Sequence, residues 1–420
     1  MKIFEDYKSK YIKTNNFIHQ KPKLDTNNII VIPAYNEPNI INALNSIKEC
    51  TLPEKSTEVI IIINSSINSP QYVIEQNKKT ETEINNWSKI NNNEKIVYHP
   101  ILLEKIPSKT AGVGYARKVG MDEAINRFIL IKNTFGFITN LDADSLVKKN
   151  YLVELENLFL TKPKTKACSI YFEHPIKGVE FPEVIYKKII EYELYLRYYS
   201  LSLKYTGFPN YYHTVGSSFA VKAETYCKQG GMNTKQAGED FYFLQKLMPL
   251  GRYEYLKSTT VYPSPRSSDR VIFGTGAYIK SSIENPKTNF FTYNFNAFKT
   301  LKNFFSQIDK FYKLDAFNYE LFNLHESINK YLKENEFEKA LKEINSNTSN
   351  LQTFRKRFFR WFDALKILKY LNYSHNIFFE KQQLIEVLND YLTSSKIKNI
   401  NISDNKSLLI YIRNLEKRLT

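Results

Sequence analysis

The stretch Asn27–Ile40, NNIIVIPAYNEPNI, indicates how the first part of the chain folds. Its apolar run IIVI predicts a short buried strand broken by Pro33, and Pro38 suits the first turn of a following helix. A second apolar run predicts another buried strand over residues 58–64. Strands that are apolar on both faces are typical of parallel sheets covered by helices on each side. The stretch therefore favours an α/β fold.

Strands and helices continue to alternate up to about residue 150. Residues 70–93 predict a helix with a frayed end, and EKIVYHP predicts a third, shorter strand. GVGYARKVGMDEAINRFI has the spacing of an amphipathic helix, and FGFITNLDAD predicts a fourth strand that leads into a loop. This order predicts a Rossmann-like, mixed but mainly parallel sheet flanked by helices, with right-handed crossovers.

The pattern changes in the second half of the chain. We expect a helix over residues 151–160, a strand over 167–172 and a long aromatic helix over about 181–204. From about residue 285 onward glycine disappears and helical patterns dominate. We therefore expect an α/β domain over residues 1–284 and an α-helical region over residues 285–420.

The composition favours anionic partners. The 420 residues include 59 Lys and Arg against 43 Asp and Glu, which gives a formal net charge of +16. Such a charge attracts nucleotides, acidic glycans or a membrane surface, and it equally fits general solubility. No recognisable nucleic-acid-binding motif accompanies it, so we expect no nucleic-acid partner.

Cysteine usage and hydropathy predict a cytoplasmic protein. The three cysteines, Cys50, Cys168 and Cys227, are far apart and suggest neither a disulfide framework nor a zinc site. The first residues, MKIFEDYKSKYIK, lack the apolar core of a signal peptide. No segment approaches the roughly 18 uninterrupted apolar residues of a membrane-spanning helix.

Polar side chains follow three of the expected strands. In α/β sheets ligands bind beyond the carboxyl ends of the strands, which places PAYNE, NSS and LDAD along one edge. Asp142 and Asp144 are one residue apart in LDAD, and such a pair suits Mn²⁺ or Mg²⁺ with open positions for phosphate oxygens. The alternative is an ordinary solvated acidic loop.

A second acidic element, GED, opens an expected helix at Gly238. Carboxylates are stable at a helix N-terminus, so Glu239 and Asp240 could simply cap this helix. The functional interpretation is a general base, with Gly238 allowing a substrate to approach closely.

Two basic elements could neutralise phosphate. AGVGYAR is not a complete G-x-G-x-x-G and does not follow a strand, so we reject a dinucleotide site there. Arg117 and Lys118 could instead bind a diphosphate, or form a solvated helix face. Arg266 and Arg270 lie in the loop SPRSSDR and could bind phosphate or carboxylate through a bidentate fork, or pair locally with Asp269.

Four elements taken in order carry a family resemblance. VIPAYNEPNIINALNSI, AGVGYARKVGMDEAI, NLDADSLV and GEDFYFLQKL together resemble the family 2 glycosyltransferases of GT-A fold, over roughly residues 27–275. The resemblance implies metal-dependent, inverting transfer of a sugar from a nucleotide diphosphate donor, most often a UDP-sugar, to a glycan or lipid-linked acceptor. A place in cell-surface polysaccharide biosynthesis would follow.

The same resemblance implies roles for individual residues. Asp142 and Asp144 would match the Asp-x-Asp motif, with Asp144 the direct metal ligand, and Asp240 would match the catalytic base, with Glu239 as the other candidate. The residues that would line the nucleotide pocket are Pro33, Ala34, Tyr35 and Glu37. One departure concerns the second strand, where INSSINS replaces an acidic DDGS-like element. Asn64 and Ser65 can still hydrogen-bond a base edge there.

Two other classes of protein compete with this interpretation. A sugar nucleotidyltransferase shares an α/β sheet and an acidic metal site, but would carry a Gly-rich basic loop directly after the first strand. A non-catalytic nucleotide-sugar-binding scaffold would have a degenerate site, and the four carboxylates at positions 142, 144, 239 and 240 argue against it.

A basic, aromatic segment lies near the end of the sequence. TFRKRFFRWFDALKILKYL, residues 353–371, has large apolar residues at helical spacing. Such a helix could lie on an anionic membrane at the inner face, where lipid-linked acceptors reside. Alternatively, the aromatic stripe packs against the catalytic domain, because large aromatic side chains more often form part of a core.

Overall fold

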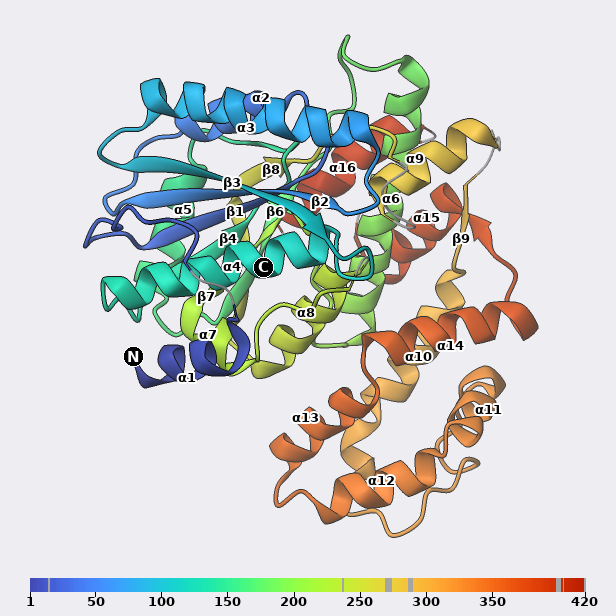
Figure 1. Cartoon of the computed structure of the whole chain (residues 1–420). Coiled ribbons are helices and arrows are strands. Elements are labelled where there is room, and N and C mark those ends of the chain that lie inside the picture. The colour runs from blue at the N-terminus through green and yellow to red at the C-terminus, as the bar shows by residue number, and fades with distance from the viewer. Residues whose placement is uncertain are drawn as a thin grey trace. The chain divides into compact units, whose positions relative to one another are not determined.

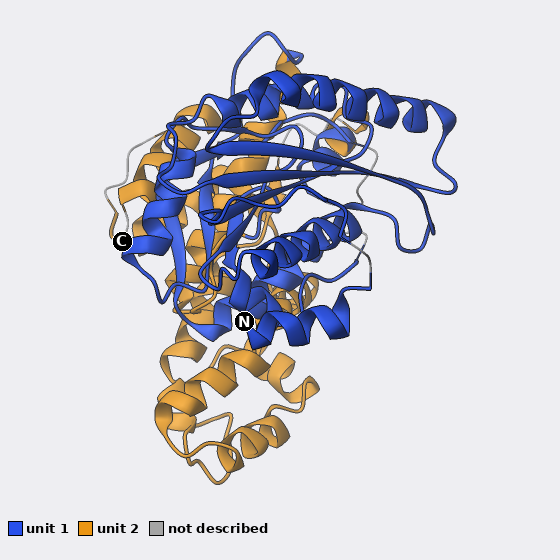
Figure 2. Cartoon of the chain, turned by 60° about the vertical axis from the view of Figure 1, so that its left-hand side comes forward, with its two compact units in different colours: residues 1–182, 214–280 blue, residues 183–213, 281–420 orange. Residues whose placement is uncertain are grey.

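A computed structural model describes residues 1–13, 16–235, 238–268, 274–285, 290–397, 402 and 404–418. The chain forms two compact units (Figure 2). Unit 1 consists of Met1–Pro182 and Thr214–Lys280, and unit 2 consists of Glu183–His213 and Ser281–Thr420. Each unit therefore combines two separate segments of the chain.

Unit 1 is built on an eight-stranded mixed sheet (Figure 1). The strand order is β3-β2-β1-β4-β7-β6-β8-β5. The first four strands in this order, β3, β2, β1 and β4, pair in parallel, and so do β6 and β8. Strand β7 runs antiparallel to both of its neighbours, β4 and β6, and β5 runs antiparallel to β8. The strands are β1 (Asn28–Ala34), β2 (Thr57–Ser66), β3 (Ile96–Ile106), β4 (Phe137–Asn140), β5 (Leu146–Val147), β6 (Ala167–Phe172), β7 (Phe219–Lys222) and β8 (Tyr253–Tyr262).

Strand β1 does not stop at the proline that the sequence suggested would break it. All seven residues of β1 are buried, and Pro33 stays in register with Ile62 of β2. On the other side of β1, pairing with β4 ends at Val31 and Asn140. Pro33 therefore lies where one side of the strand has no ladder, so its missing N–H is tolerated.

Helices cover both faces of the sheet in unit 1. Helix α4 contacts β1 and β2, and α3 contacts β2 and β3. Figure 1 shows α2 and α3 on one side of these strands and α4 on the other. The helices of this unit are α1 (Lys2–Tyr11), α2 (Ile40–Lys48), α3 (Gln71–Asn91), α4 (Val113–Leu130), α5 (Tyr151–Thr161), α7 (Ala223–Lys228), α8 (Glu239–Leu247) and the 3₁₀ turn η1 (Met248–Leu250), and α9 (Thr275–Glu284) crosses its boundary.

Close packing explains the two continuous apolar strands. A Cβ atom added to Gly120 of α4 would lie 2.4 Å from Val31 Cγ1, so the helix lies directly on β1. Nine of the ten residues of β2 are buried in the same way. The expected α/β architecture with helices on both faces is therefore confirmed, although β3 is longer than the sequence suggested.

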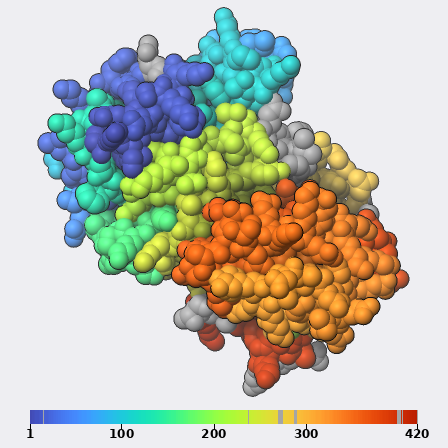
Figure 3. Space-filling model, turned by 90° about the horizontal axis from the view of Figure 1, so that it is seen from below, coloured from blue at the N-terminus to red at the C-terminus, as the bar shows by residue number. Residues whose placement is uncertain are grey.

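Unit 2 is helical. Helix α6 packs against α10, α15 and α16, and α11 packs against α12 and α14. In the space-filling view, residues of about 300–370 form one continuous orange region of this face (Figure 3). The elements of unit 2 are α6 (Glu183–Thr206), β9 (Phe291–Thr292), α10 (Phe295–Ser306), the 3₁₀ turn η2 (Ile308–Phe311), α11 (Glu326–Glu334), α12 (Phe337–Ser346), α13 (Leu351–Trp361), α14 (Ala364–Ile377), β10 (Gln382–Gln383), α15 (Leu384–Ser394) and α16 (Asn405–Arg418).

The basic segment 353–371 forms two helices. Helix α13 ends at Trp361, and Asp363 caps α14 by accepting a hydrogen bond from the Lys366 N–H at 2.8 Å. The aromatic side chains of Phe354 and Phe358 are fully buried within unit 2. The aromatic stripe is therefore part of this unit's core.

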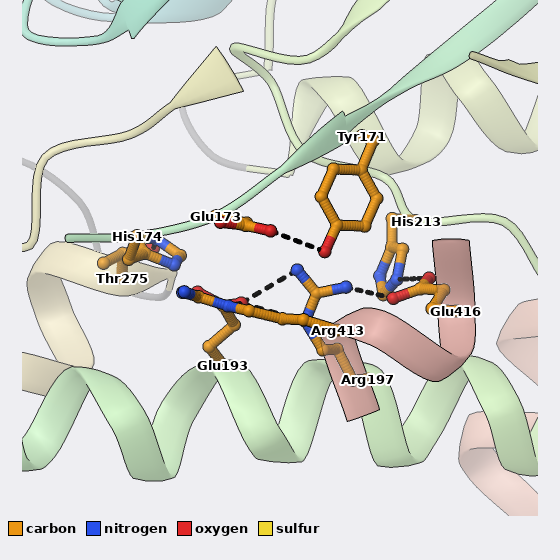
Figure 4. Close-up of polar contacts among 9 residues, drawn as sticks. All are labelled: Tyr171, Glu173, His174, Glu193, Arg197, His213, Thr275, Arg413 and Glu416. Carbon is orange, nitrogen blue, oxygen red and sulfur yellow. Dashed lines mark hydrogen bonds and ion pairs between the residues drawn. The ribbon is translucent and has the colours of Figure 1, made fainter. Parts of the chain in front are cut away.

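A buried network of charges joins α6 to α16 (Figure 4). Glu193 accepts hydrogen bonds from Arg197 Nε at 2.9 Å and from Arg413 Nη2 at 2.7 Å. Arg197 also pairs with Glu416, whose carboxylate lies 2.9 Å from His213 Nε2. Buried charges are costly unless paired, and here each arginine bridges or contacts a buried carboxylate.

Within the described residues, no helix combines the length and apolar character needed to cross a bilayer.

Candidate active site

The two aspartates of LDAD lie on one tight turn at the end of β4. The Leu141 N–H donates to Val31 O at 3.1 Å, which extends the pairing with β1 by one residue. The chain then turns, and the Ser145 N–H donates to Asp142 O at 3.0 Å. Asp142 and Asp144 are therefore held by the backbone at the carboxyl edge of the parallel strands, as the strand order predicts.

Arg117 joins this turn to helix α8. Its guanidinium pairs with Asp142 at 2.5 Å and with Glu239, and only 3% of the arginine is exposed. Burial alone would lower the pKa of Arg117. The charges of Asp142 and Glu239 raise this pKa by more than burial lowers it, so the guanidinium remains charged. The sequence left two roles open for Arg117, a diphosphate ligand or part of a solvated helix face. The residue is buried and links two acidic elements of the edge, so it does not form a solvated helix face.

Glycine makes room for this arginine. A Cβ atom on Gly216 would lie 2.4 Å from Arg117 Nη2, and one on Gly114 would lie 2.3 Å from Lys235 O. Gly114 belongs to the AGVGYAR segment, but the sequence did not indicate Gly216, because its contact with Arg117 joins positions that are far apart in the chain.

The GED element opens α8 at the same edge. Gly238 adopts a left-handed conformation, with φ of 69°, and Glu239 and Asp240 form the first turn. Burial raises the pKa of Glu239 to about 7, partly opposed by Arg117, and the neighbouring Asp240 adds to the rise. Burial also raises the pKa of Asp240. Glu239 is 3% exposed, whereas Asp240 is half-buried, so Asp240 is the more accessible carboxylate.

Arg266 brings a second positive charge to the turn. Its Nε lies 2.6 Å from Asp144 Oδ2, and its Nη2 lies 2.5 Å from Glu37 Oε1. Burial lowers the pKa of Arg266, but Asp144 and Glu37 raise it more. Arg270, the other arginine of the loop, lies outside the described residues.

The residues expected to line a nucleotide pocket lie at the carboxyl ends of β1 and β2 or directly after β1. Pro33, Ala34 and Glu37 are buried and Tyr35 is half-buried. Asn64 and Ser65 at the end of β2 are also buried. The Asn64 amide donates to Gly112 O at 3.2 Å, so this side chain fixes the loop before α4.

Lys118 points to a different cluster. Its Nζ lies 2.7 Å from Asp122 Oδ2 and 3.4 Å from Tyr7 Oη. Asp122 also accepts hydrogen bonds from Tyr7 and Tyr226, both at 2.7 Å. The structure therefore groups Lys118 with α1 and α7 and does not bring it to the turn that carries Asp142.

The turn offers hard oxygen ligands to a divalent cation. Asp142 and Asp144 supply carboxylates, the ligand type that Mn²⁺ and Mg²⁺ prefer. Both carboxylates are already paired with guanidinium groups, which shows that this position attracts positive charge. Across the described residues, no group of three or more His, Cys, Asp or Glu side chains is arranged to hold a metal ion. A cation bound here would thus complete its coordination with oxygens of a ligand.

The fold and this acidic edge together indicate a ligand site at the carboxyl ends of the parallel strands, with carboxylates that suit a divalent cation. Residues 29–224 match the model of the family described as glycosyl transferase family 2. The matched residues lie within the part of the chain that carries the resemblance, and the match supports the predicted family and enzyme class. The predicted α/β fold class, with a mixed but mainly parallel sheet flanked by helices, is confirmed by the structure.

Several solved structures are similar. One is S. aureus TarS, residues 1–349, in complex with UDP-GlcNAc, with 16% identity, a TM-score of 0.39, and coverage of 93% of this chain and 88% of that one. Another is glucosyl-3-phosphoglycerate synthase from Mycobacterium tuberculosis in complex with Mn²⁺, UDP and glucosyl-3-phosphoglycerate. It has 13% identity, a TM-score of 0.34, and coverage of 69% of this chain and 87% of that one. The search of curated protein sequences found no match.

Proposed function

We propose that this chain transfers a sugar from a UDP-sugar to an acceptor hydroxyl, with inversion at the anomeric carbon and with a divalent cation bound at the turn. One observation carries the proposal. Arg117 links Asp142 of the turn to Glu239 of the Glu239–Asp240 pair, so both acidic elements lie at one edge of the sheet. UDP is the nucleotide that the family resemblance implies.

The turn would bind the donor's diphosphate. Mn²⁺ or Mg²⁺, held by Asp144 and Asp142, would neutralise the negative charge that develops on the leaving diphosphate. Pro33, Ala34 and Tyr35 would line the nucleotide pocket, in which Asn64 and Ser65 also lie. Asn64 is already bonded to Gly112 O, so its main contribution would be to the shape of the pocket.

Asp240 would act as the general base. It would accept the proton of the acceptor hydroxyl while that oxygen attacks the anomeric carbon from the face opposite the diphosphate. The new carbon–oxygen bond forms as the bond to the diphosphate oxygen breaks. Glu239 would act as a positioning residue, because its carboxylate is paired with Arg117 and is almost fully buried.

The first experiment is a donor panel. Purified protein would be incubated with UDP-, GDP- and dTDP-sugars, with and without Mn²⁺, and release of the nucleoside diphosphate would be measured. We expect metal-dependent hydrolysis of one UDP-sugar. Binding of nucleotides with no hydrolysis of any donor would instead favour the scaffold alternative, and pyrophosphate-dependent formation of nucleoside triphosphate would favour the nucleotidyltransferase.

The same assay tests the base. Asp240→Asn should reduce transfer by about 10²–10⁴-fold, the usual contribution of a general base, while UDP affinity stays unchanged. Asp240 does not contact Arg117 through a bond that the variant would break, so the link between Asp142 and Glu239 should persist. Near-normal turnover of Asp240→Asn would show that another group takes the proton.

The acceptor and the location of the enzyme follow from the resemblance and the composition. We propose a glycan or lipid-linked acceptor in cell-surface polysaccharide biosynthesis, and a cytoplasmic enzyme. The three cysteines are buried free thiols, which suits a reducing compartment. Peripheral contact with the inner membrane face through residues 353–371 stays a prediction.

A further inference from the structure

Arg266 lies between two carboxylates of the candidate site. It bonds Asp144 through Nε and Glu37 through Nη2, so two of its donor groups point to two different acidic residues. The side chains of Arg266 and Asp144 are 28% and 27% exposed, within reach of solvent and ligands. The position beside Asp144 that a metal ion would use is therefore already filled by a charge of the protein itself.

The two contacts of Arg266 are not equivalent. Glu37 follows β1, its side chain is only 7% exposed, and its carbonyl accepts a hydrogen bond from Thr80 Oγ1 at 3.1 Å. Asp144 is more exposed and lies on the four-residue turn. Removing a counterion from a buried carboxylate costs more than removing it from one that water can reach. The contact with Asp144 is therefore the one that can exchange.

We propose that Arg266 is a built-in counterion that competes with the divalent cation for Asp144, and that the donor diphosphate relieves this competition. The diphosphate draws the Nε side of the guanidinium away from Asp144, while Glu37 keeps its bond to Nη2. Cation and nucleoside diphosphate then bind with positive coupling. The inference rests on the proposed function, because it requires a diphosphate and a divalent cation in this site.

The few protein side chains available to bind a cation also favour coupling between the cation and the diphosphate. In the part of the chain that the structure describes, no cluster of three or more acidic, His or Cys side chains is arranged for a metal. Two carboxylates, each already paired with a guanidinium group, hold a hard cation weakly until phosphate oxygens join them. Coupling between two ligands is reciprocal, so Mn²⁺ should strengthen UDP binding by the same factor by which UDP strengthens Mn²⁺ binding.

The test measures metal binding without turnover. Free Mn²⁺ gives an electron paramagnetic resonance signal that is lost on binding, so its affinity can be titrated with and without UDP. Without UDP, Arg266→Gln should bind Mn²⁺ at least about 10-fold more tightly than the wild-type protein, or ~1.4 kcal/mol. The gain in Mn²⁺ affinity on adding UDP should shrink by the same factor.

Two further variants serve as controls. Arg355→Gln removes the same charge from an exposed pair with Asp309 in unit 2, and should leave Mn²⁺ affinity unchanged. Adding Asp144→Asn to Arg266→Gln should cancel the gain, which would locate the metal at Asp144. Thermal melts of all variants establish that they are folded.

The outcomes separate the two levels of the proposal. If the wild-type protein binds UDP with Mn²⁺ but Arg266→Gln binds Mn²⁺ alone no more tightly, the counterion role is wrong and the proposed function stands. Equal Mn²⁺ affinity of the wild type with and without UDP would also show that the counterion role of Arg266 is wrong. If the wild type binds neither UDP nor Mn²⁺, the proposed function fails as well.

Discussion

Arg117 is a single guanidinium shared among several carboxylates. It pairs with Asp142 and Glu239, and the charge of Asp240 acts on it as well. Burial of the Glu239 carboxylate raises its pKa to about 7, and the charges of Asp240 and Asp142 add to the rise. Arg117 opposes this rise but does not cancel it. Glu239 should therefore exchange its proton near neutral pH.

This shift predicts a pH dependence of stability. The pKa of Glu239 rises from 4.5 in the ordinary state to about 7 in the folded protein, so the folded state keeps a proton that the unfolded chain releases. The free energy of unfolding should thus fall as pH rises from 4.5 to 7. Glu239→Gln removes this titration. Between pH 5 and pH 8 the free energy of unfolding of the variant should therefore fall by on the order of 3 kcal/mol less than that of the protein that carries Glu239.

The two tryptophans allow this measurement in unit 1 alone. In a Trp361→Phe background, Trp87 is the single remaining tryptophan and belongs to unit 1. Urea unfolding followed by its fluorescence, at pH 5, 6, 7 and 8, compares Glu239→Gln with this parent. Parallel pH profiles for the two proteins would contradict the raised pKa.

The sequence predicted which residues meet at the edge, but not how they pair. Strand order alone brought PAYNE, NSS and LDAD to one edge, because the carboxyl ends of parallel strands lie together. The GED element was linked to that edge only by the family resemblance. The bond of Arg266 to Asp144 depends on an irregular loop whose path no periodicity encodes. The same holds for Gly216, whose missing side chain matters only because Arg117 reaches it from another helix. The roles of these residues stay predictions.

Among the elements, α13 shows what composition can and cannot reveal. Its basic and aromatic residues predicted an amphipathic helix, which could lie on a membrane or pack against the catalytic domain. Phe354 and Phe358 are buried in unit 2, whereas Lys356 and Arg357 are exposed. Amphipathic periodicity identifies the apolar face, but what covers that face is decided by tertiary packing. The break before Asp363 was also missed, because the apolar spacing continues across it.

We therefore expect any membrane binding by this element to be electrostatic. The intact protein should sediment with anionic vesicles at low salt, and should be released at high salt as the charges are screened. The double variant Lys356→Gln and Arg357→Gln should weaken this binding. The control replaces Lys2 and Lys10, two exposed residues of α1, by glutamine.

Binding to zwitterionic vesicles, or binding that persists at high salt, would point to insertion of apolar side chains. That result would require the buried aromatic face of α13 to open. Equal weakening by both double variants would show that only the overall charge of the protein matters.

At the scale of the whole molecule, unit 2 is assembled from two distant segments. Helix α6 packs against α10, α15 and α16, and its Glu193 and Arg197 are paired with Arg413 and Glu416. A division of the chain at residues 284 and 285, which the glycine distribution suggested, stays a prediction. Composition could not indicate the partners of α6, because they lie about 90 to 220 residues further along the chain.

The buried charges make this division testable. A chain that ends at residue 284 retains α6 but loses the partners of Glu193 and Arg197, and loss of one partner from a buried ion pair costs about 3–5 kcal/mol. We expect this chain to aggregate or to bind a hydrophobic dye strongly. Co-expression of residues 281–420 as a separate chain should restore solubility by supplying α10, α15 and α16. A soluble, active 1–284 chain would instead support an independent catalytic domain ending there.

The same discontinuity has a consequence for synthesis on the ribosome. Helix α6 is translated well before α16, and roughly 200 residues separate them. At about 5–20 residues per second, the interval lasts about 10–40 s. During that time the Glu193 and Arg197 side chains have no α16 to pair with, although much of the sheet has already been made. The nascent enzyme should therefore depend on chaperones until its final helix emerges.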